Sequence, residues 1–518
     1  MTGSGLEHVR HTRGNRKMVF LPSGRRAFLN VALTLARDCF VEPVIWIGDA
    51  NLEREAAAAF PTVSIVPELF AVRPPEGFPP ETPGPASQAA RLLELYDSEE
   101  WRVFFPLICA EYDRFPQMNT LRQLDRDAIV RGLGATLLDL FLERRPDFLL
   151  ATETPHNALG LATLAVARFL SVPTLFFQPT SSVGPNLVPR TDFDTIFSSE
   201  AFSASLKRLD GDFPDLSATR ADLARRLLTG YTASREPPRF LLQQAEPQGL
   251  GLQRERFVKR QSRVELLAVA RGLMSGRQPD SLFLEGLFDS YRRRFLNAAA
   301  AISGRFVTHP KERAAVFGLH YQPERTSVPE GPLDTSQVQA VLRARAALPK
   351  AMHLYVKEHP SQVSGNRSGY LGRSPHFYSL LDRVPGITVL GADFPLVSVL
   401  EKVSLVFTLT GTVGVQAVLR GIPCVYFGNP WWQQMPGSWR FESSISVTEI
   451  LLSDGPSIAD IHDFLLHRLM SQSLPGFSSP SQEKSWSVAE GDLAQRVLLA
   501  EQQYFVLTVD AFLQDRGL

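Results

Sequence analysis

Residues 403–428 read VSLVFTLTGTVGVQAVLRGIPCVYFG, and this stretch decides the fold. An apolar strand ends at Leu409, and a turn of glycine, threonine and valine follows over 410–414. A helical segment then runs up to Gly421, which is placed to cap it, and Pro423 opens a second apolar strand. Strand, turn, helix and strand in this order predict a β-α-β unit, and such units build parallel sheets.

The turn of this unit has the composition of a phosphate site. Glycine lets backbone amides approach a ligand closely, and a helix start offers unpaired N–H groups at the positive end of its dipole. The hydroxyls of Thr410 and Thr412 would add further donors. The alternative is that Thr-Gly-Thr only caps the helix, and these residues alone leave both readings open.

Similar patterns on both sides of this unit predict a two-domain α/β chain. Five short apolar runs alternate with helical segments from residue 314 to 428, which predicts a doubly wound domain. Residues 17–49 and 146–178 repeat the strand-helix-strand order. The predicted parts are an N-terminal Rossmann-like domain (1–235), a helical connecting region (236–305), a C-terminal Rossmann-like domain (306–480) and a C-terminal helix returning toward the first domain (481–518). We expect the two Rossmann-like domains to face a cleft, at which parallel strands aim their carboxyl ends.

Composition excludes several classes of protein. The chain has 518 residues, of which 44% are hydrophobic and 21% charged, and Lys+Arg and Asp+Glu each number 54. Zero net charge gives no reason to expect nucleic acid as a partner. Three widely spaced cysteines indicate neither a disulfide framework nor a metal site. We find no membrane-length apolar run and no secretory signal, so we expect a cytoplasmic protein. Peripheral contact with the inner membrane stays open through the basic stretches 8–17 and 254–263.

Two more strands of the second domain are followed by polar residues, in LHYQPE (319–324) and YVKEHP (355–360). A histidine before proline is held extended, so His359 would point onward from its strand and bind a phosphate oxygen. Lys357 would lie on the same side by strand alternation. A lone surface histidine is the plainer alternative, but three polar strand ends in one sheet favour a ligand site. The candidate nucleotide ligands at these two strand ends are His320, Gln322, Glu324, Lys357, His359 and Pro360.

LHYQPE, YVKEHP and TGTVGVQAVLRGIPCVYFG (410–428) together resemble the C-terminal half of bacterial capsule-polysaccharide biosynthesis proteins. Those are GT-B glycosyltransferases and include Kdo transferases. The His-Pro element followed by a threonine-rich helix start is also similar to the CMP-binding pair of bacterial sialyltransferases. By this resemblance, His359 would bind the phosphate of a nucleotide. The residues that would contact phosphate or ribose are Thr410, Gly411, Thr412 and Gly414.

The sequence departs from the family pattern in the helix of this unit. Many relatives resemble GTVGxEALxxGKP, whereas this chain has Gln416 and Ile422 at two of those positions. If an acidic side chain contacts the ribose of the donor in relatives, Gln416 must do so here as a neutral hydrogen-bonding group.

In the first domain the candidates for acid–base chemistry are carboxylates. Glu153 follows a predicted strand, and an inverting transferase needs such a base to deprotonate the acceptor hydroxyl. Stabilisation of a helix start is the alternative for Glu153. Asp113 is the competing base, unless it only pairs with Arg114. The candidate acceptor-binding residues are Arg25, His156 and Asn157, although Arg25 and Arg26 could be a solvated pair.

We therefore expect a GT-B-like glycosyltransferase that acts without a metal or other cofactor, since a helix dipole and an imidazole can stabilise the phosphate in place of a cation. Its substrates would be a nucleotide sugar, CMP-linked Kdo or a sialic-acid-like sugar, and a surface or capsular polysaccharide acceptor. His359 would also stabilise charge on the departing phosphate. Other polysaccharide-assembly proteins are expected partners. The alternatives are a UDP-sugar transferase, a 2-epimerase-like enzyme and a non-catalytic polysaccharide-assembly protein.

Overall fold

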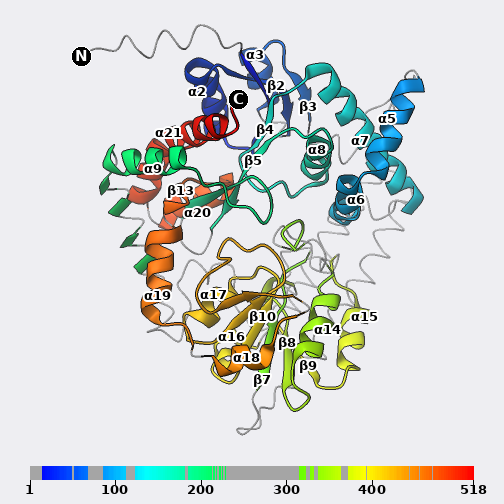
Figure 1. Cartoon of the computed structure of the whole chain (residues 1–518), viewed down its shortest axis with the longest axis vertical. Coiled ribbons are helices and arrows are strands. Elements are labelled where there is room, and N and C mark those ends of the chain that lie inside the picture. The colour runs from blue at the N-terminus through cyan, green and yellow to red at the C-terminus, as the bar shows by residue number, and fades with distance from the viewer. Residues whose placement is uncertain are drawn as a thin grey trace, which may run out of the picture. The chain divides into compact units, whose positions relative to one another are not determined.

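The structure is a computed structural model, and Figure 1 shows the whole chain. It describes residues 15–48, 52–67, 86–112, 123–180, 185–228, 314–322, 327–331, 336–362 and 372–518, with isolated gaps in the fifth and last ranges. The predicted connecting region 236–305 lies outside the described residues. The chain forms two compact units. Unit 1 comprises Met1–Cys109, Gln123–Leu223 and Arg468–Leu518, and unit 2 comprises Ala110–Arg122 and Ala224–His467.

Unit 1 is built on a seven-stranded sheet whose order is β13-β6-β5-β4-β1-β2-β3. Strands β1 to β5 run parallel, β6 is antiparallel to β5, and β13 is antiparallel to β6. The strands are β1 (Arg16–Leu21), β2 (Val41–Ile47), β3 (Ser64–Val66), β4 (Phe148–Ala151), β5 (Thr174–Pro179), β6 (Asn186–Arg190) and β13 (Leu474–Pro475). The helices are α2 (Arg26–Cys39), α3 (Glu53–Ala59), α5 (Ala86–Asp97), α6 (Glu99–Tyr112), α7 (Gln123–Arg144), α8 (Ala158–Phe169), α9 (Glu200–Asp212), α20 (Pro480–Ala489) and α21 (Gly491–Asp515).

The first β-α-β unit forms as its sequence predicts. From Met18 to Leu21, strand β1 is apolar on both faces and buried, which is typical of a parallel strand with helices on both sides. Helix α2 buries Phe28, Val31 and Leu35, which recur at helical spacing. The helix ends at Phe40, whose φ of +54° turns the chain into β2.

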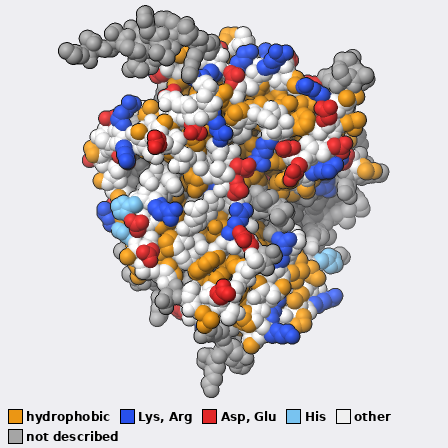
Figure 2. Space-filling model, in the orientation of Figure 1, with side chains coloured by type: hydrophobic (Ala, Val, Ile, Leu, Met, Phe, Trp, Pro, Cys, Tyr) orange, Lys and Arg blue, Asp and Glu red, His pale blue; other side chains and the backbone are white. Residues whose placement is uncertain are grey.

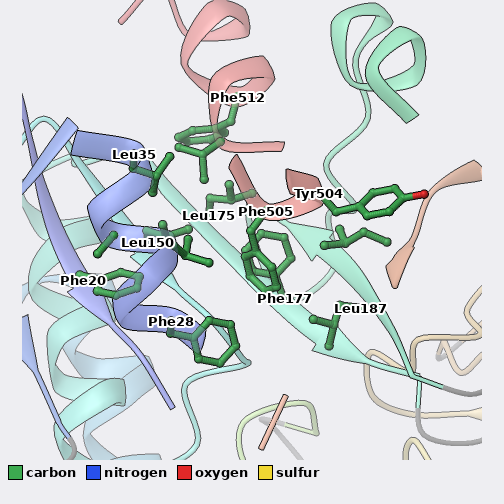
Figure 3. Packing of buried hydrophobic residues seen from close by; sticks show 14 of the residues in the cluster. Phe20, Phe28, Leu35, Leu150, Leu175, Phe177, Leu187, Tyr504, Phe505 and Phe512 are labelled. Atoms are coloured by element: carbon green, nitrogen blue, oxygen red, sulfur yellow. The ribbon is translucent and has the colours of Figure 1, made fainter. Parts of the chain in front are cut away.

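The C-terminal helix α21 belongs to the core of unit 1 (Figure 3). Phe505 packs on Phe177 of β5 and Phe28 of α2, with ring centroids 4.5 and 5.2 Å apart. Phe512 lies against Phe148 of β4, 6.1 Å between centroids. Residues 468–480, which the sequence analysis placed in the second domain, also lie in unit 1. The reason is that β13 pairs with β6 and closes that edge of the sheet.

Unit 2 is built on a six-stranded, entirely parallel sheet in the order β12-β11-β10-β7-β8-β9. The strands are β7 (Ala314–Gly318), β8 (His353–Lys357), β9 (Ile387–Leu390), β10 (Leu405–Thr408), β11 (Cys424–Tyr426) and β12 (Ser438–Arg440). The helices are α14 (Val338–Ala347), α15 (Pro375–Asp382), α16 (Leu396–Leu400), α17 (Val413–Val418), α18 (Val447–Leu452) and α19 (Ile458–Asp463), with a 3-10 turn at Pro360–Gln362 and a π-helical turn at Phe464–Leu469.

The stretch 403–428 forms the predicted unit β10-α17-β11. Helix α17 is shorter than predicted and ends at Val418. Gly421 follows with φ of +74°, a conformation that glycine adopts at no steric cost. The predicted α/β class, two doubly wound sheets with a C-terminal helix, is confirmed.

Both sheets reverse their strand order at one point, between β1 and β4 in unit 1 and between β7 and β10 in unit 2. In open parallel sheets, ligands bind outside the carboxyl ends of the strands at such a switch point. Within the described residues, no helix has the length and hydropathy needed to cross a membrane. On the face in Figure 2, acidic and basic side chains are interspersed without a large patch of one sign.

Candidate functional site

The switch point of unit 2 is organised by a histidine and a threonine. Nε2 of His320, which follows β7, accepts the backbone N–H of Thr410 at 3.1 Å and lies 3.3 Å from Oγ1 of Thr408. That hydroxyl in turn accepts the N–H of Gly411 at 3.2 Å. A Cβ at Gly411 would lie 2.7 Å from Oγ1 of Thr408 and 3.2 Å from Nε2 of His320. Glycine is therefore required here so that the turn can approach the end of β7.

His320 is neutral in this arrangement. Burial lowers its pKa to about 3, and the nearby charges of His359 and Arg373 act in the same direction. Because Nε2 accepts the Thr410 N–H, the ring proton must be on Nδ1. His320 thus shapes the turn after β10, and a positive charge at this site must come from another residue.

Two glutamine side chains hold the segment after β7, and the sequence analysis missed both. The amide of Gln337 accepts from N of His320 at 2.8 Å and donates to its carbonyl at 3.2 Å. The amide of Gln362 does the same for Gln322, at 2.8 and 2.9 Å. Each side-chain amide therefore satisfies one backbone N–H and one backbone C=O, as a paired strand would. Gln337 adopts φ of +63°, a conformation that costs free energy for a non-glycine residue.

The side chain of Gln322 is also used within the chain. Its Nε2 donates to Oγ of Ser327 at 3.2 Å, and the residue is buried. These contacts assign Gln322 to the support of the loop after β7. Glu324, the third candidate in this loop, lies outside the described residues.

The end of β8 brings His359 toward the same switch point. His359 is half-buried, and its ring centroid lies 6.4 Å from that of Tyr321, the residue after His320. Pro360 begins the 3-10 turn that follows. The ammonium group of Lys357 is buried and donates to the carbonyls of Glu358 at 2.7 Å and Ala392 at 3.2 Å. Lys357 thus contacts the main chain after β8 and β9.

Beside His359 lies a buried ion pair that the sequence analysis did not single out. Arg373 donates to both carboxylate oxygens of Glu358 at 3.1 Å. The two side chains are 0% and 2% exposed. The segment that leads into α15 is thereby fastened to the end of β8.

Two of the candidates in the turn after β10 have different surroundings. Thr412 stands before α17 with helical φ and ψ of −63° and −11°, and among the described residues its side chain makes no capping bond. Thr412 is therefore not the helix cap of the alternative reading, since a cap needs extended backbone. Gly414, by contrast, packs where a Cβ would overlap the indole of Trp432. The absence of a side chain at Gly414 therefore lets α17 pack against Trp432. Gln416 lies in α17 and is 9% exposed.

In unit 1, Glu153 follows β4 at the switch point. Its side chain is 17% exposed, and its Oε1 lies 3.8 Å from Nδ1 of His156. That Nδ1 is 2.9 Å from the carbonyl of Thr154, so the ring nitrogen donates there. Asn157 caps α8 by accepting the N–H of Gly160 at 2.7 Å. The structure therefore brings Glu153 and His156 together and gives Asn157 a capping role. Asp113 lies outside the described residues.

Arg25 is not available as the acceptor-binding residue that the sequence suggested. It is 2% exposed and pairs with Glu501 of α21 at 2.6 and 2.8 Å. It also donates to Glu483 at 2.7 Å and to the carbonyl of Phe477 at 2.6 Å. Four of the five N–H groups of the guanidinium thus bind the C-terminal segment. Only Arg26 matches the solvated alternative, with a side chain 78% exposed.

Comparison with known proteins supports the sequence resemblance. Residues 331–440 match the family described as capsule polysaccharide biosynthesis protein, so the resemblance is confirmed over that segment. A curated relative is the capsule polysaccharide modification protein LipA of Neisseria meningitidis serogroup B, 32% identical over 79 residues. The aligned stretch covers 15% of this chain and 10% of the length of LipA.

Two solved structures of carbohydrate enzymes also match this chain. One is the beta Kdo 2,7 transferase of Thermosulfurimonas dismutans KpsC, with 12% identity, coverage of 65% of this chain and 79% of that chain, and a TM-score of 0.28. Another is the UDP-GlcNAc 2-epimerase of Neisseria meningitidis, with 10% identity, coverage of 96% and 100%, and a TM-score of 0.19.

Proposed function

We propose that this chain is a glycosyltransferase of bacterial capsule or surface polysaccharide assembly. One observation carries the proposal. The family match over 331–440 contains the end of β10, at the switch point of unit 2, and the end of β8, on the other side of β7. The general rule for ligand binding in parallel sheets and the family match therefore fall on the same residues.

Unit 2 would bind the nucleotide sugar. The N–H and hydroxyl of Thr412 would donate to a phosphate, while the N–H groups of Thr410 and Gly411 donate to His320 and Thr408 and keep the turn in shape. His320 is neutral, so the side-chain cation beside the phosphate would be protonated His359. Gln416, on the helix that follows, would contact the ribose. We propose a CMP-linked Kdo or sialic-acid-like donor, on the strength of the His-Pro element and the threonine-rich turn.

Unit 1 would hold the glycan acceptor, with Glu153 as the base. Glu153 would take the proton of the acceptor hydroxyl while the oxygen attacks the anomeric carbon. The bond from that carbon to the phosphate breaks, and the departing phosphate carries the electron pair into the donors of unit 2. His156, 3.8 Å from the Glu153 carboxylate, would orient the base or the acceptor.

The donor site is tested by nucleotide binding. CMP should raise the melting temperature, because a ligand at about 100 times its Kd stabilises the folded protein by about 2.7 kcal/mol. UDP and GDP should raise it less if the donor is CMP-linked. His359→Ala should weaken the CMP shift and sugar transfer without unfolding the protein. His376→Ala, which removes an exposed histidine of α15 in the same unit, is the matched control.

The outcomes separate the alternatives. A melting shift with UDP instead of CMP would indicate a UDP-linked donor in place of the proposed CMP-linked one. No shift with any of the three nucleotides would support a non-catalytic assembly protein. Equal CMP binding and turnover in wild type and His359→Ala would refute the role of His359.

We also propose that transfer needs no metal, because helix and turn N–H groups can stabilise the phosphate. Among the described residues, no group of three His, Cys, Asp or Glu side chains is arranged to hold an ion. Turnover should survive EDTA, and loss that Mg²⁺ or Mn²⁺ restores would contradict this.

The proposed location is the cytoplasm, with peripheral contact to the inner membrane and to other polysaccharide-assembly proteins. The basic stretches 8–17 and 254–263, on which membrane contact depends, lie outside the described residues. Co-sedimentation with anionic and neutral vesicles tests this, and equal recovery with both would count against an electrostatic contact.

A further inference from the structure

The carboxylate of Glu358 is saturated with hydrogen bonds. Its Oε1 accepts the backbone N–H of His359 at 2.7 Å and Nη2 of Arg373 at 3.1 Å. Its Oε2 accepts Nε of Arg373 at 3.1 Å and the hydroxyl of Tyr378 at 2.7 Å. Each oxygen thus has two donors, which is the capacity of a carboxylate oxygen. Glu358 is also 2% exposed, so it is neither free nor placed to take a proton from a substrate.

Arg373 connects this carboxylate to the neighbouring strand. Its Nη2 donates to the carbonyl of His320 at 2.9 Å as well as to Glu358. The guanidinium lies over the ring of Phe377, with Cζ 4.3 Å from the centroid. Phe377 and Tyr378 are neighbours on α15, so one helix supports both halves of the ion pair. The side chain of Arg373 is 0% exposed and can act on a substrate only through the residues that it contacts.

His359 is therefore constrained from two sides. Its N–H is held by the Glu358 carboxylate, and Pro360 restricts its backbone to extended conformations. Arg373 fixes the carbonyl of His320, whose ring holds the turn after β10. The same buried ion pair thus sets the position of both histidines at the switch point.

We propose that Glu358, Arg373 and Tyr378 form a positioning clamp that sets His359 against the turn 410–412. None of the three touches the substrate. They hold the imidazole where it meets the phosphate of a bound nucleotide, and this last step rests on the proposed function.

Tyr378→Phe is the mildest test, because it removes one donor to Glu358 and leaves the ion pair with Arg373 in place. With CMP as the probe, loss of one hydrogen bond should weaken binding about fivefold if it disturbs His359. In a His359→Ala background the same change should weaken binding less than about twofold, since the group that the clamp positions is gone. Tyr355→Phe, a buried tyrosine on β8, is the matched control and should change neither value.

A second readout does not depend on nucleotide binding. In histidine-labelled protein, the NMR resonance of His359, assigned through His359→Ala, should move and titrate at a different pH in Tyr378→Phe. The resonance of His353, which bonds Thr388 at the other end of β8, should stay in place.

These readouts separate the clamp from the proposed function. An unmoved His359 resonance, or the same loss of CMP affinity in both backgrounds, would overturn the clamp. If wild type binds no CMP, the proposed donor site fails, and the NMR comparison alone decides the clamp.

Discussion

The two switch points of this chain have the same topology and different uses. In unit 1, Arg25 after β1 is buried in contacts with the C-terminal segment, and Oγ of Ser23 donates to the carbonyl of Ser478 at 2.5 Å. In unit 2, the loops after β7 and β10 bond to each other through His320. The switch point of unit 1 holds the C-terminal helix α21 through Arg25. The loops at the switch point of unit 2 are held by residues of the same sheet region. A charged residue at a strand end therefore does not by itself identify a ligand site.

Two threonines, Thr152 just after β4 and Thr408 at the end of β10, make the comparison closer. Oγ1 of Thr152 accepts the N–H of Ser23 at 2.8 Å, across the switch point of unit 1. Oγ1 of Thr408, which ends β10, lies 3.3 Å from Nε2 of His320 across that of unit 2. Both hydroxyls tie the loops on either side of the switch, so the units differ in the groups that surround this bond.

The largest effect is expected at Glu153, the proposed base. Glu153→Gln keeps size and hydrogen bonding but loses basicity, so the rate of transfer should fall about 10²–10⁴-fold. Binding of CMP should be nearly unchanged, because the proposed donor site lies in unit 2. Steady-state transfer and nucleotide titration check this. A wild-type rate would move the base elsewhere, first to Asp113, whose Asp113→Asn variant is the next test.

Arg25→Met should destabilise unit 1 by about 3–5 kcal/mol, because it leaves Glu501 buried without its cation. Arg26→Met is the matched control and should cost at most about 1 kcal/mol, since Arg26 and its partner Glu55 are exposed. Urea unfolding of both variants measures the difference. Where both variants are folded, Arg25→Met and Arg26→Met should bind CMP with the same affinity. If Arg25→Met instead leaves stability unchanged and weakens acceptor binding, the unit 1 switch point is a ligand site after all.

The packing of α17 gives a smaller effect in unit 2. Gly414→Ala should cost about 1–3 kcal/mol, because the new methyl group overlaps Trp432. Gly211→Ala in α9 meets nothing within 4 Å and should be neutral or slightly stabilising. Thermal melts compare the two. An unchanged melting temperature for Gly414→Ala would mean that Trp432 is free to move.

The effect that should be smallest near neutral pH is a pH dependence of stability. The pKa of His320 is lowered by burial to about 3 from the ordinary 6.5, so the folded protein binds this proton less well than the unfolded chain. The contribution of neutral His320 is complete above about pH 6.5 and is lost as pH falls toward 3. The slope is at most about 1.4 kcal/mol per pH unit. His320→Gln should remove this part of the pH dependence of unfolding. An identical pH dependence in wild type and variant would show that His320 is not buried and neutral.

Sequence patterns predicted the fold because they report local structure. The apolar runs and the turn residues predicted both sheets, and Gly421, in the turn after α17, adopts the positive φ that its position implies. The antiparallel strands β6 and β13 were missed, and the pairing of β13 with β6 joins residues far apart in the chain. The same reason explains why the structural role of Arg25 was missed, since its partner Glu501 lies 476 residues away in the sequence.

The site was predicted in part. The turn after β10 and the ends of β7 and β8 are where the sequence placed them. What the sequence did not show is which side chains serve the fold, such as Gln322 and Lys357. Glutamine amides that bond to the main chain after a strand, and arginines that join two strand ends, leave no recognisable sequence pattern. Their hydrogen bonds form only after the sheet has formed.

Hydrogen exchange with and without CMP tests the central claim most directly, because it reports which of the two switch points binds the nucleotide. The account predicts slower exchange over 408–416 and 355–360 at saturating CMP, with residues 21–26 and 151–157 unchanged. Protection confined to the loops after β1 and β4, or none anywhere at saturation, would contradict it.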